Sequence, residues 1–195
     1  ESAFAYTPIG TLTISEGVEE MDTCAFFDCN NLQTVHLPAS LSYLGNNVFG
    51  SCASLSTLTV SEGKYFFGAD NCVITHGGTI VAGCNGSVIP QDGSVKTIGD
   101  YAFWDMDGLL TVNLPDGLKS IGDYAFYECD GLTSVVIPDS VTYLGLYAFA
   151  GAGNLAQAQL SDQMDFMGSS AFAGTALTSV DLGDSLPFIA PFAFE

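Results

Sequence analysis

Residues 109–131 read LLTVNLPDGLKSIGDYAFYECDG, and residues 132–154 repeat the same pattern as LTSVVIPDSVTYLGLYAFAGAGN. Leu109, Leu132 and Leu155 therefore follow one another at intervals of 23 residues. A fixed period of this size is typical of a solenoid, in which each unit buries its apolar face only against its neighbours. The stretch predicts a stack of similar coils.

The first residues of each repeat alternate apolar and polar side chains and include β-branched residues, which is typical of a β-strand. Proline then ends the strand in several coils, because it has no N–H for the hydrogen-bond ladder. A glycine follows, where a turn with positive φ is one reason for the residue. The Ala-Phe pair is expected on a short helical or 3-10 turn. The prolines are Pro38, Pro90, Pro115 and Pro138, and the glycines are Gly45, Gly99, Gly122, Gly145 and Gly168.

The phenylalanine of the Ala-Phe pair marks the coils. Phe103, Phe126, Phe149 and Phe172 are spaced by 23 residues, as are Phe26 and Phe49, and Phe194 follows Phe172 after 22. Rings at this spacing predict one continuous internal spine. The interval from Phe49 to Phe103 is 54 residues, which is two periods plus eight residues.

An insertion at about 62–86 explains the long interval. Asn71–Ile74 and Thr79–Ala82 are short apolar runs around His76-Gly77-Gly78, a pattern that predicts a β-hairpin. We therefore expect one modified coil rather than a domain boundary. The prediction is a single domain over residues 1–195 with about eight coils, which start near Ile9, Leu32, Leu55, Cys84, Leu109, Leu132, Leu155 and Leu177.

The composition excludes some classes of partner. The chain has 22 acidic residues against three lysines and no arginine, a formal net charge of −19. Nucleic acid and anionic membrane surfaces would be repelled, so neither is expected as a partner. The acidic excess either attracts basic partners or keeps an apolar body soluble. No apolar run reaches the roughly 18 residues of a membrane-spanning helix, so no membrane insertion is expected from these residues.

The six cysteines show neither a C-x-x-C pair nor a zinc-finger spacing, so no metal site is predicted. Cys29, Cys52 and Cys129 each lie three residues after the repeated phenylalanine, where Met106, Ala152 and Thr175 stand in other coils. This mixture predicts a small buried packing position. Disulfides are geometrically possible between Cys29 and Cys52, in neighbouring coils, and between Cys72 and Cys84, which flank the hairpin.

Several phrases carry a resemblance to a known family. Ile-Pro-Asp-Ser-Val at 137–141, Ile-Gly-Asp-Tyr-Ala-Phe at 98–103 and 121–126, and the trailing Cys129 resemble the BspA-like, or treponemal-type, leucine-rich repeats. The interrupted coil also resembles one in that family, with Asn-Cys-Val-Ile at 71–74, Ile-Val-Ala-Gly-Cys at 80–84 and Val-Ile-Pro at 88–90.

The resemblance implies a β-rich, right-handed leucine-rich-repeat solenoid with a parallel sheet on one face and irregular turns on the other. It also implies a secreted or surface-attached bacterial protein, in some members one that adheres to host matrix proteins or to other bacteria, and no catalytic residues. The sequence begins without an initiator methionine or a signal peptide, and it ends inside a repeat phrase. Both ends are therefore expected to be boundaries within a longer protein.

The outward positions of the strand phrase are candidate binding residues, because side chains alternate between the faces of a strand. They form a neutral, hydroxyl-rich and amide-rich ladder on an acidic molecule, which suits recognition of a protein or glycan. The alternative is that small β-branched residues merely favour a sheet. The candidates are Thr11, Thr13, Thr34, His36, Thr57, Thr59, Thr111, Asn113, Ser134, Gln157, Gln159 and Asp181.

Two aromatic groups are further candidates. Tyr65, Phe66 and Phe67 in the insertion either replace the missing spine unit or, with His76, form a contact patch. The repeated tyrosines at 101, 124 and 147 either stack on a glycan or pack as scaffold, and Trp104 is expected to be half-buried beside acids.

No arrangement of residues indicates catalysis. Neither of the two histidines, His36 and His76, stands in a hydrolase or metalloprotease motif. No cofactor and no enzymatic activity are expected. The sequence predicts a non-catalytic protein-interaction or adhesion module of a bacterial cell-surface protein. The alternatives are a structural spacer, or stalk, and a glycan-recognition module; the chain is expected to be a monomer or to associate weakly end to end.

Overall fold

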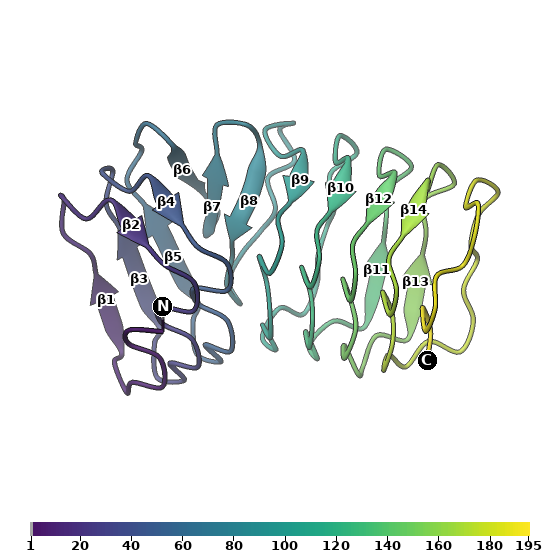
Figure 1. Ribbon diagram of the computed structural model, residues 1–195, viewed down its shortest axis with the longest axis horizontal. Coiled ribbons are helices and arrows are strands. Elements are labelled where there is room, and N and C mark those ends of the chain that lie inside the picture. Colours follow the sequence, from purple (N-terminus) through teal and green to yellow (C-terminus); the bar gives the residue numbers. More distant parts are fainter. Residues whose placement is uncertain (1) are drawn as a thin grey trace.

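The computed structural model describes residues 2–195, so that Glu1, the first residue of the expected domain, lies outside it. The chain forms a solenoid whose coils stack along one long axis, with the N-terminal coils at the left and the C-terminal coils at the right of Figure 1. Short strands recur at two places around the circumference of the coils, and we call them the first and second strand rows. The β-rich solenoid that the repeat predicts is confirmed.

The first strand row holds the segment before the proline. Its strands are parallel, and β1 pairs with β3 through Thr11 and Thr34, while β3 pairs with β5 through Thr34 and Thr57. Val35 and Leu58 point inward and are buried, whereas the threonines beside them point outward, as the alternation predicts. The strands of this row are β1 (Thr11–Thr13), β3 (Thr34–Leu37), β5 (Thr57–Val60), β11 (Ser134–Val136) and β13 (Gln157–Gln159).

The second strand row lies where irregular turns were expected, so that expectation was wrong. Ser120 pairs in parallel with Thr97 on one side and with Tyr143 on the other, and the apolar residue after each of them is buried. Inward burial of this residue holds the short segments in register. The row contains β2 (Glu20–Met21), β4 (Tyr43–Leu44), β9 (Thr97–Ile98), β10 (Ser120–Ile121), β12 (Tyr143–Leu144) and β14 (Phe166–Met167).

The glycine after the second strand does not have a positive φ, so its backbone conformation does not require glycine. Close packing between coils requires it instead. A Cβ added at Gly145 would lie 2.5 Å from the backbone nitrogen of Asp123, in the preceding coil. At Gly45 the same atom would lie 2.4 Å from the nitrogen of Thr23. Any side chain here would push neighbouring coils apart.

The Ala-Phe pair lies in a turn, and residues 2–195 contain no helical or 3-10 segment, so the expected helical turn was wrong. Each turn, which we call a corner, has positive φ at two residues four apart, such as Tyr124 at 55° and Glu128 at 55°. The N–H groups of Tyr124, Phe126 and Glu128 donate to carbonyl oxygens of the next coil at 2.8, 2.7 and 2.8 Å. A helix would use its N–H groups internally and could not form this ladder.

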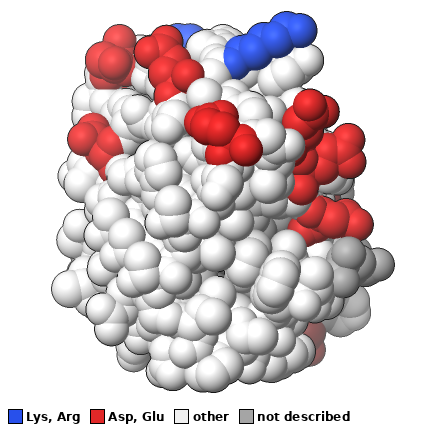
Figure 2. Space-filling model, turned by 90° about the vertical axis from the view of Figure 1, so that its left-hand side faces the viewer, with Lys and Arg blue, Asp and Glu red and all other residues white. Residues whose placement is uncertain are grey.

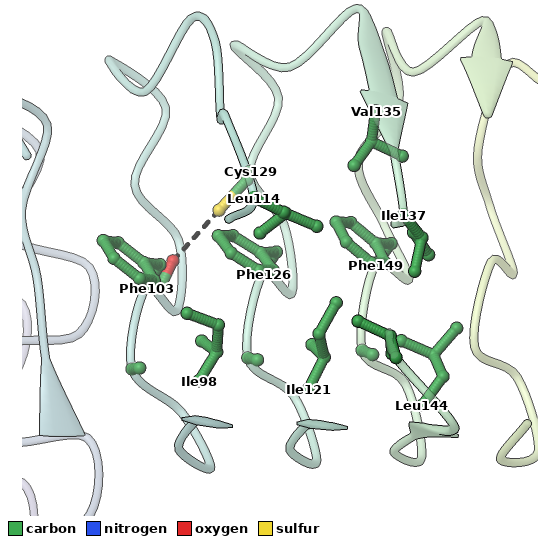
Figure 3. Close-up of a cluster of buried hydrophobic side chains, with 14 of the residues drawn as sticks. Ile98, Phe103, Leu114, Ile121, Phe126, Cys129, Val135, Ile137, Leu144 and Phe149 are labelled. Atoms are coloured by element: carbon green, nitrogen blue, oxygen red, sulfur yellow. Dashed lines mark hydrogen bonds between the residues drawn. The ribbon is translucent and has the colours of Figure 1, made fainter. Parts of the chain in front are cut away.

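The phenylalanine spine is present but is divided in two. Phe103, Phe126 and Phe149 are fully buried, and successive rings stack with centroids 5.0 Å apart (Figure 3). Phe26 and Phe49 stack at 6.0 Å in the N-terminal coils. The single continuous spine expected from the spacing was wrong.

Gly83 lies at the break in the spine. Its N–H donates to the carbonyl oxygen of Ala102 at 2.8 Å. A Cβ at Gly83 would lie 1.9 Å from Cε1 of Phe103, so the backbone at Gly83 covers this ring where a phenylalanine of another coil would stack. The buried residues accordingly form an N-terminal core and a C-terminal core.

The insertion forms an antiparallel meander of β6 (Phe66–Ala69), β7 (Cys72–Thr75) and β8 (Thr79–Ala82). The hairpin around His76-Gly77-Gly78 is thereby confirmed, and β6 is an additional strand. Strand β8 pairs in parallel with β9, so the meander extends the second strand row. Val73 packs in the N-terminal core and Ile74 in the C-terminal core, so β7 joins the two cores.

All six cysteines are free thiols, so neither candidate disulfide is formed in this structure. Cys29, Cys52 and Cys129 are buried as expected. Each thiol also donates to the phenylalanine carbonyl of the preceding coil, as in the 3.0 Å contact from Cys129 Sγ to Phe103 O in Figure 3. The equivalent distance from Cys52 to Phe26 is 3.2 Å. Burial raises the pKa of the Cys52 thiol to about 12.

Candidate functional site

The outward side chains of the first strand row form the candidate site, and its N-terminal part is internally hydrogen-bonded. His36 Nδ1 and Thr59 Oγ1 are 3.0 Å apart, and His36 Nε2 lies 3.3 Å from the hydroxyl of Ser61. Thr59 also donates to the carbonyl oxygen of Val35 at 3.3 Å. Thr11 and Thr13 are exposed beside this network, whereas Thr34 and Thr57 are half-buried. The polar groups around His36 are therefore largely satisfied within the sheet.

Asn71 connects the two halves of this face across the insertion. Its Oδ1 accepts the N–H of Leu58 at 3.2 Å, and its Nδ2 donates to the carbonyl oxygen of Gly86 at 2.9 Å. The side chain thus replaces ladder hydrogen bonds that a neighbouring strand would supply. Sequence reasoning missed this role, although an asparagine at the first position of the hairpin was a visible signal.

The C-terminal part of the face is hollowed, and we call it the C-terminal groove. A cavity of about 720 Å³ lies over β11, β13 and the segment that bridges Gln159 to Asp181. A second cavity of about 260 Å³ continues it toward Thr111. The two cavities are lined in part by Thr111, Asn113, Ser134, Val136, Gln157, Gln159 and Asp181.

Some polar side chains of the groove form no hydrogen bond within residues 2–195. The side-chain amides of Gln157 and Gln159 are exposed and make no hydrogen bond with other groups of residues 2–195. The hydroxyl oxygen of Ser140, which lines an adjoining cavity of about 400 Å³, is buried and also lacks a partner in the described chain. Val136 is 56% exposed between these polar groups. The structure thus brings together the C-terminal half of the predicted ladder, with Val136 as an apolar centre.

The candidate residues of the insertion differ in how deeply they are buried. Phe66 is buried in the N-terminal core, so its ring cannot contribute to a surface patch, and the expectation that it contacts a partner was wrong. Tyr65 is exposed, and Lys64 Nζ lies 5.0 Å from its ring centroid. His76 is exposed, stacks on Phe67 at 5.6 Å and lies 3.0 Å from the carbonyl oxygen of Gly63. Of the residues expected in this patch, Tyr65 and His76 are exposed and Phe67 is half-buried.

A cluster of aromatic side chains lies on the corners of three successive coils, and we call it the aromatic corner. The rings of Tyr101, Tyr124 and Tyr147 stack in one column with centroids 5.1 and 4.9 Å apart. Trp104 and Tyr127 stack beside them at 4.3 Å. All five rings are half-buried. The expected half-burial of Trp104 is confirmed, but sequence reasoning missed its contacts with Tyr101, Tyr124 and Tyr127.

The acidic side chains are unevenly distributed at the N-terminal end of the molecule. Viewed from that end, they gather mainly in the upper part and along the right, and the lower left of the view shows none (Figure 2). Within residues 2–195 no group of three or more His, Cys, Asp or Glu side chains could hold a metal ion. The same residues include no helix of the length and apolarity needed to cross a membrane.

Comparison with known proteins identifies the family. The sequence model of the BspA type leucine rich repeat region matches residues 1–70 and 81–195, in 6 copies. No curated protein matches the chain. The unmatched residues 71–80 fall in the hairpin of the insertion.

Solved structures support the fold. A leucine-rich repeat protein from Eubacterium ventriosum is 16% identical, with a TM-score of 0.73, and the match covers 100% of this chain and 72% of that one. A leucine rich repeat protein from T. pallidum is 22% identical, with a TM-score of 0.53, over 93% of this chain and 72% of that one. A leucine rich cell surface protein from Faecalibacterium prausnitzii is 23% identical, with a TM-score of 0.63, over 95% of this chain and 51% of that one. Because the family model matches most of its length, the chain belongs to the BspA-type leucine-rich repeat family.

Proposed function

We propose that this chain is a non-catalytic interaction module of an exported bacterial cell-surface protein and that it binds a protein partner in the C-terminal groove. The observation that carries the proposal is the groove itself, in which unpartnered amides surround an exposed valine. Family membership supports a protein-interaction repeat, and a related solved structure is a cell surface protein. We propose further that residues 1–195 act as one unit.

The chemistry of the groove favours a protein over a charged ligand. The glutamine amides can each donate and accept hydrogen bonds, so they suit the peptide groups of an extended segment. Val136 supplies apolar area at the centre, and the polar groups lie around it, as in many protein interfaces. Because the groove has no aromatic or arginine anchor, each contact should be weak, and adhesion would depend on several copies acting together.

The test is binding of the chain to host matrix proteins and to intact bacteria, measured by biolayer interferometry. The groove variant Val136→Glu with Gln157→Glu places two charges where the partner would pack. The matched control, Thr11→Glu with Thr13→Glu, adds the same charge on the N-terminal part of the same face. We expect the groove variant to lose at least about tenfold in affinity, equivalent to about 1.4 kcal/mol, while the control binds like the wild type.

Other outcomes would favour different functions. An equal loss of affinity in both variants would mean that the added charge decides binding and that the groove does not. An absence of binding to every surface tested would favour a spacer that holds other parts of a larger protein apart. Binding that disappears at about 0.5 M salt in the wild type would mean that the acidic charge merely collects basic proteins.

A further inference from the structure

The first strand row is open at the boundary between residues 112–114 and β11, and we call this boundary the open edge. Residues 109–115 form no strand, although they carry the strand phrase of the repeat, and β11 pairs only with β13. Among residues 2–195 no hydrogen bond joins the two sides. The cavity of about 260 Å³ that extends the C-terminal groove lies between them.

The same two coils are hydrogen-bonded elsewhere around their circumference. At the corner the N–H of Phe126 donates to the carbonyl oxygen of Ala148 at 2.7 Å, and in the second strand row β10 pairs with β12. Val112 is half-buried, whereas Val35 and Val135, at the same position in other coils, are 0% and 3% exposed. The coils are therefore joined on two sides and can separate on the third without breaking a backbone hydrogen bond.

The register of the paired coils shows which groups face the open edge. Across β11 and β13 the N–H of Ile137 donates to the carbonyl oxygen of Gln159 at 2.8 Å. Leu114 and Val136 occupy the same two positions at the open edge, where this bond is not formed. By the alternation of a parallel ladder, the N–H of Val112 also points toward β11. Leu114 is only 9% exposed, so its N–H is a nearly buried donor without an acceptor in the described chain.

The two preceding breaks in the first strand row are bridged by side-chain amides. Asn71 bridges the first, and Gln91 Nε2 bridges the second by donating to the carbonyl oxygens of Ile89 and Asn113, both at 2.9 Å. No side chain of residues 2–195 does this at the open edge. Because unpaired backbone groups are costly to bury, the open edge needs donors and acceptors from outside these residues.

We propose that an extended peptide segment of the partner protein enters the open edge as an added β-strand. Its alternating N–H and C=O groups match those of the two edges, a pattern that the hydroxyl groups of a glycan do not reproduce. Its apolar side chains would meet Val112 and Leu114, which line the cavity. Asp116 is the charged residue of this lining, so a neutral or basic segment is favoured over an acidic one. The proposal rests on the function proposed above and specifies how the groove holds its partner.

The probe is a capped peptide with the sequence Gly-Thr-Leu-Thr-Ile-Ser of residues 10–15, because this phrase already pairs as β1 with β3. The peptide is titrated into the isotopically labelled chain, and NMR follows each backbone N–H. We expect the signals of Val112, Leu114 and Val136 to shift saturably and their exchange with solvent to slow by at least about tenfold.

A control peptide separates backbone pairing from side-chain contacts. It keeps the same side chains, but its amide nitrogens are methylated and cannot donate hydrogen bonds. We expect this peptide to bind at least about tenfold more weakly than the unmethylated one.

Two proline variants test the edge from the side of the chain. Val112→Pro removes an N–H that faces the open edge, and Leu110→Pro removes one from the same stretch but outside the edge. Neither N–H has a partner within residues 2–195, and proline suits an extended chain. We expect the peptide to bind Val112→Pro at least about tenfold more weakly and Leu110→Pro less than about threefold more weakly. Melting temperatures show whether each variant is folded, and if Val112→Pro is not, the methylated peptide decides.

Three results would overturn the proposal. Unchanged exchange at the open edge with the peptide in excess would show that water alone occupies it. Equal binding of the methylated peptide would show that backbone groups are not recognised. Signal shifts confined to β1 or to the last coil would show that the peptide pairs only at an end of the solenoid.

The outcome can be told apart from that of the proposed function. If the peptide does not pair but Val136→Glu with Gln157→Glu still loses the partner, the groove function stands and strand addition fails. If the peptide pairs but the chain binds neither matrix proteins nor bacteria, strand addition stands and the proposed partner is wrong.

Discussion

At the scale of single residues, stability depends on side chains that repeat their contacts in several coils. Phe126 stacks between Phe103 and Phe149, and the thiol of Cys129 hydrogen-bonds the carbonyl group of Phe103. These two contacts bind this coil to its neighbours, one through ring packing and one through a hydrogen bond. A residue of this kind therefore affects three coils at once.

Replacement of Phe126 by alanine is expected to lower the free energy of unfolding by about 3–5 kcal/mol, because it leaves a cavity between two rings. Urea unfolding followed by circular dichroism measures the change. Phe4→Ala is the control, since Phe4 stacks on Phe26 at 5.2 Å but is 54% exposed at the N-terminal end. A similar loss in both variants would contradict the assignment of Phe126 to the buried spine.

Asp105 is expected to destabilise the fold at neutral pH. Burial raises its pKa above the usual range, and Asp107, Glu128 and Asp28 raise it further. A carboxyl group with a raised folded-state pKa costs stability as the pH rises through that pKa, and this cost disappears in acid. Asp105→Asn should raise the melting temperature at pH 7 by about 1–2 °C.

Comparison of thermal melts at pH 7 and pH 3 separates the charge from the backbone, because asparagine also suits the positive φ of 53° at this position. The pH-dependent part of the difference should vanish at pH 3. A difference of the same size at both pH values would assign the whole effect to the backbone.

At the scale of elements, the meander of the insertion decides how the two cores meet. Strand β7 contributes Val73 to one core and Ile74 to the other, and Gly83, just after β8, covers the ring of Phe103. The sheet of the second strand row continues from β9 into the meander and ends at β6, whereas β2 and β4 form a separate sheet. The insertion thus ends this sheet and also interrupts the phenylalanine stacking inside.

Gly83→Ala is expected to destabilise the protein by about 1–3 kcal/mol or more, because its Cβ would lie 1.9 Å from Phe103 and the site is overpacked. Gly77→Ala, at the hairpin tip, is the matched control, since its Cβ would meet only the Thr75 hydroxyl at 3.6 Å. Thermal melting of both variants measures the difference. Equal melting temperatures would show that the backbone at Gly83 does not cover the ring.

At the scale of the whole molecule, the charge opposes the fold. A net charge of −19 on 195 residues makes the compact state repel itself at low ionic strength. The predicted weak end-to-end association remains a prediction, and low ionic strength should suppress it.

The melting temperature is expected to rise by several degrees between 0.01 and 0.15 M NaCl, because the Debye length falls from about 30 Å to about 8 Å. The control is the variant Asp139→Asn, Asp162→Asn, Asp184→Asn, in which a smaller net charge should reduce the rise. A melting temperature independent of salt in the wild type would show that the carboxylates are too far apart to repel one another.

The sequence alone determined the solenoid, its period and the inward and outward positions of the first strand row. A repeated phrase such as that of 109–131 reveals these features because every coil meets the same neighbours. It also determined the hairpin at 71–82, whose turn residues act locally. It did not determine that Ser120-Ile121 forms a strand, because two residues show no alternation of their own and pair only when a neighbouring coil lies in register.

Only the tertiary structure decided the features that depend on contacts between coils. The divided spine follows from the position of Gly83 against Phe103, and the groove follows from the placement of β11 and β13 beside Asp181. The aromatic corner likewise joins residues 23 positions apart whose rings meet only after stacking. Spacing in a sequence predicts which residues repeat, but distances between coils decide which of them touch a neighbour and which remain free for a partner.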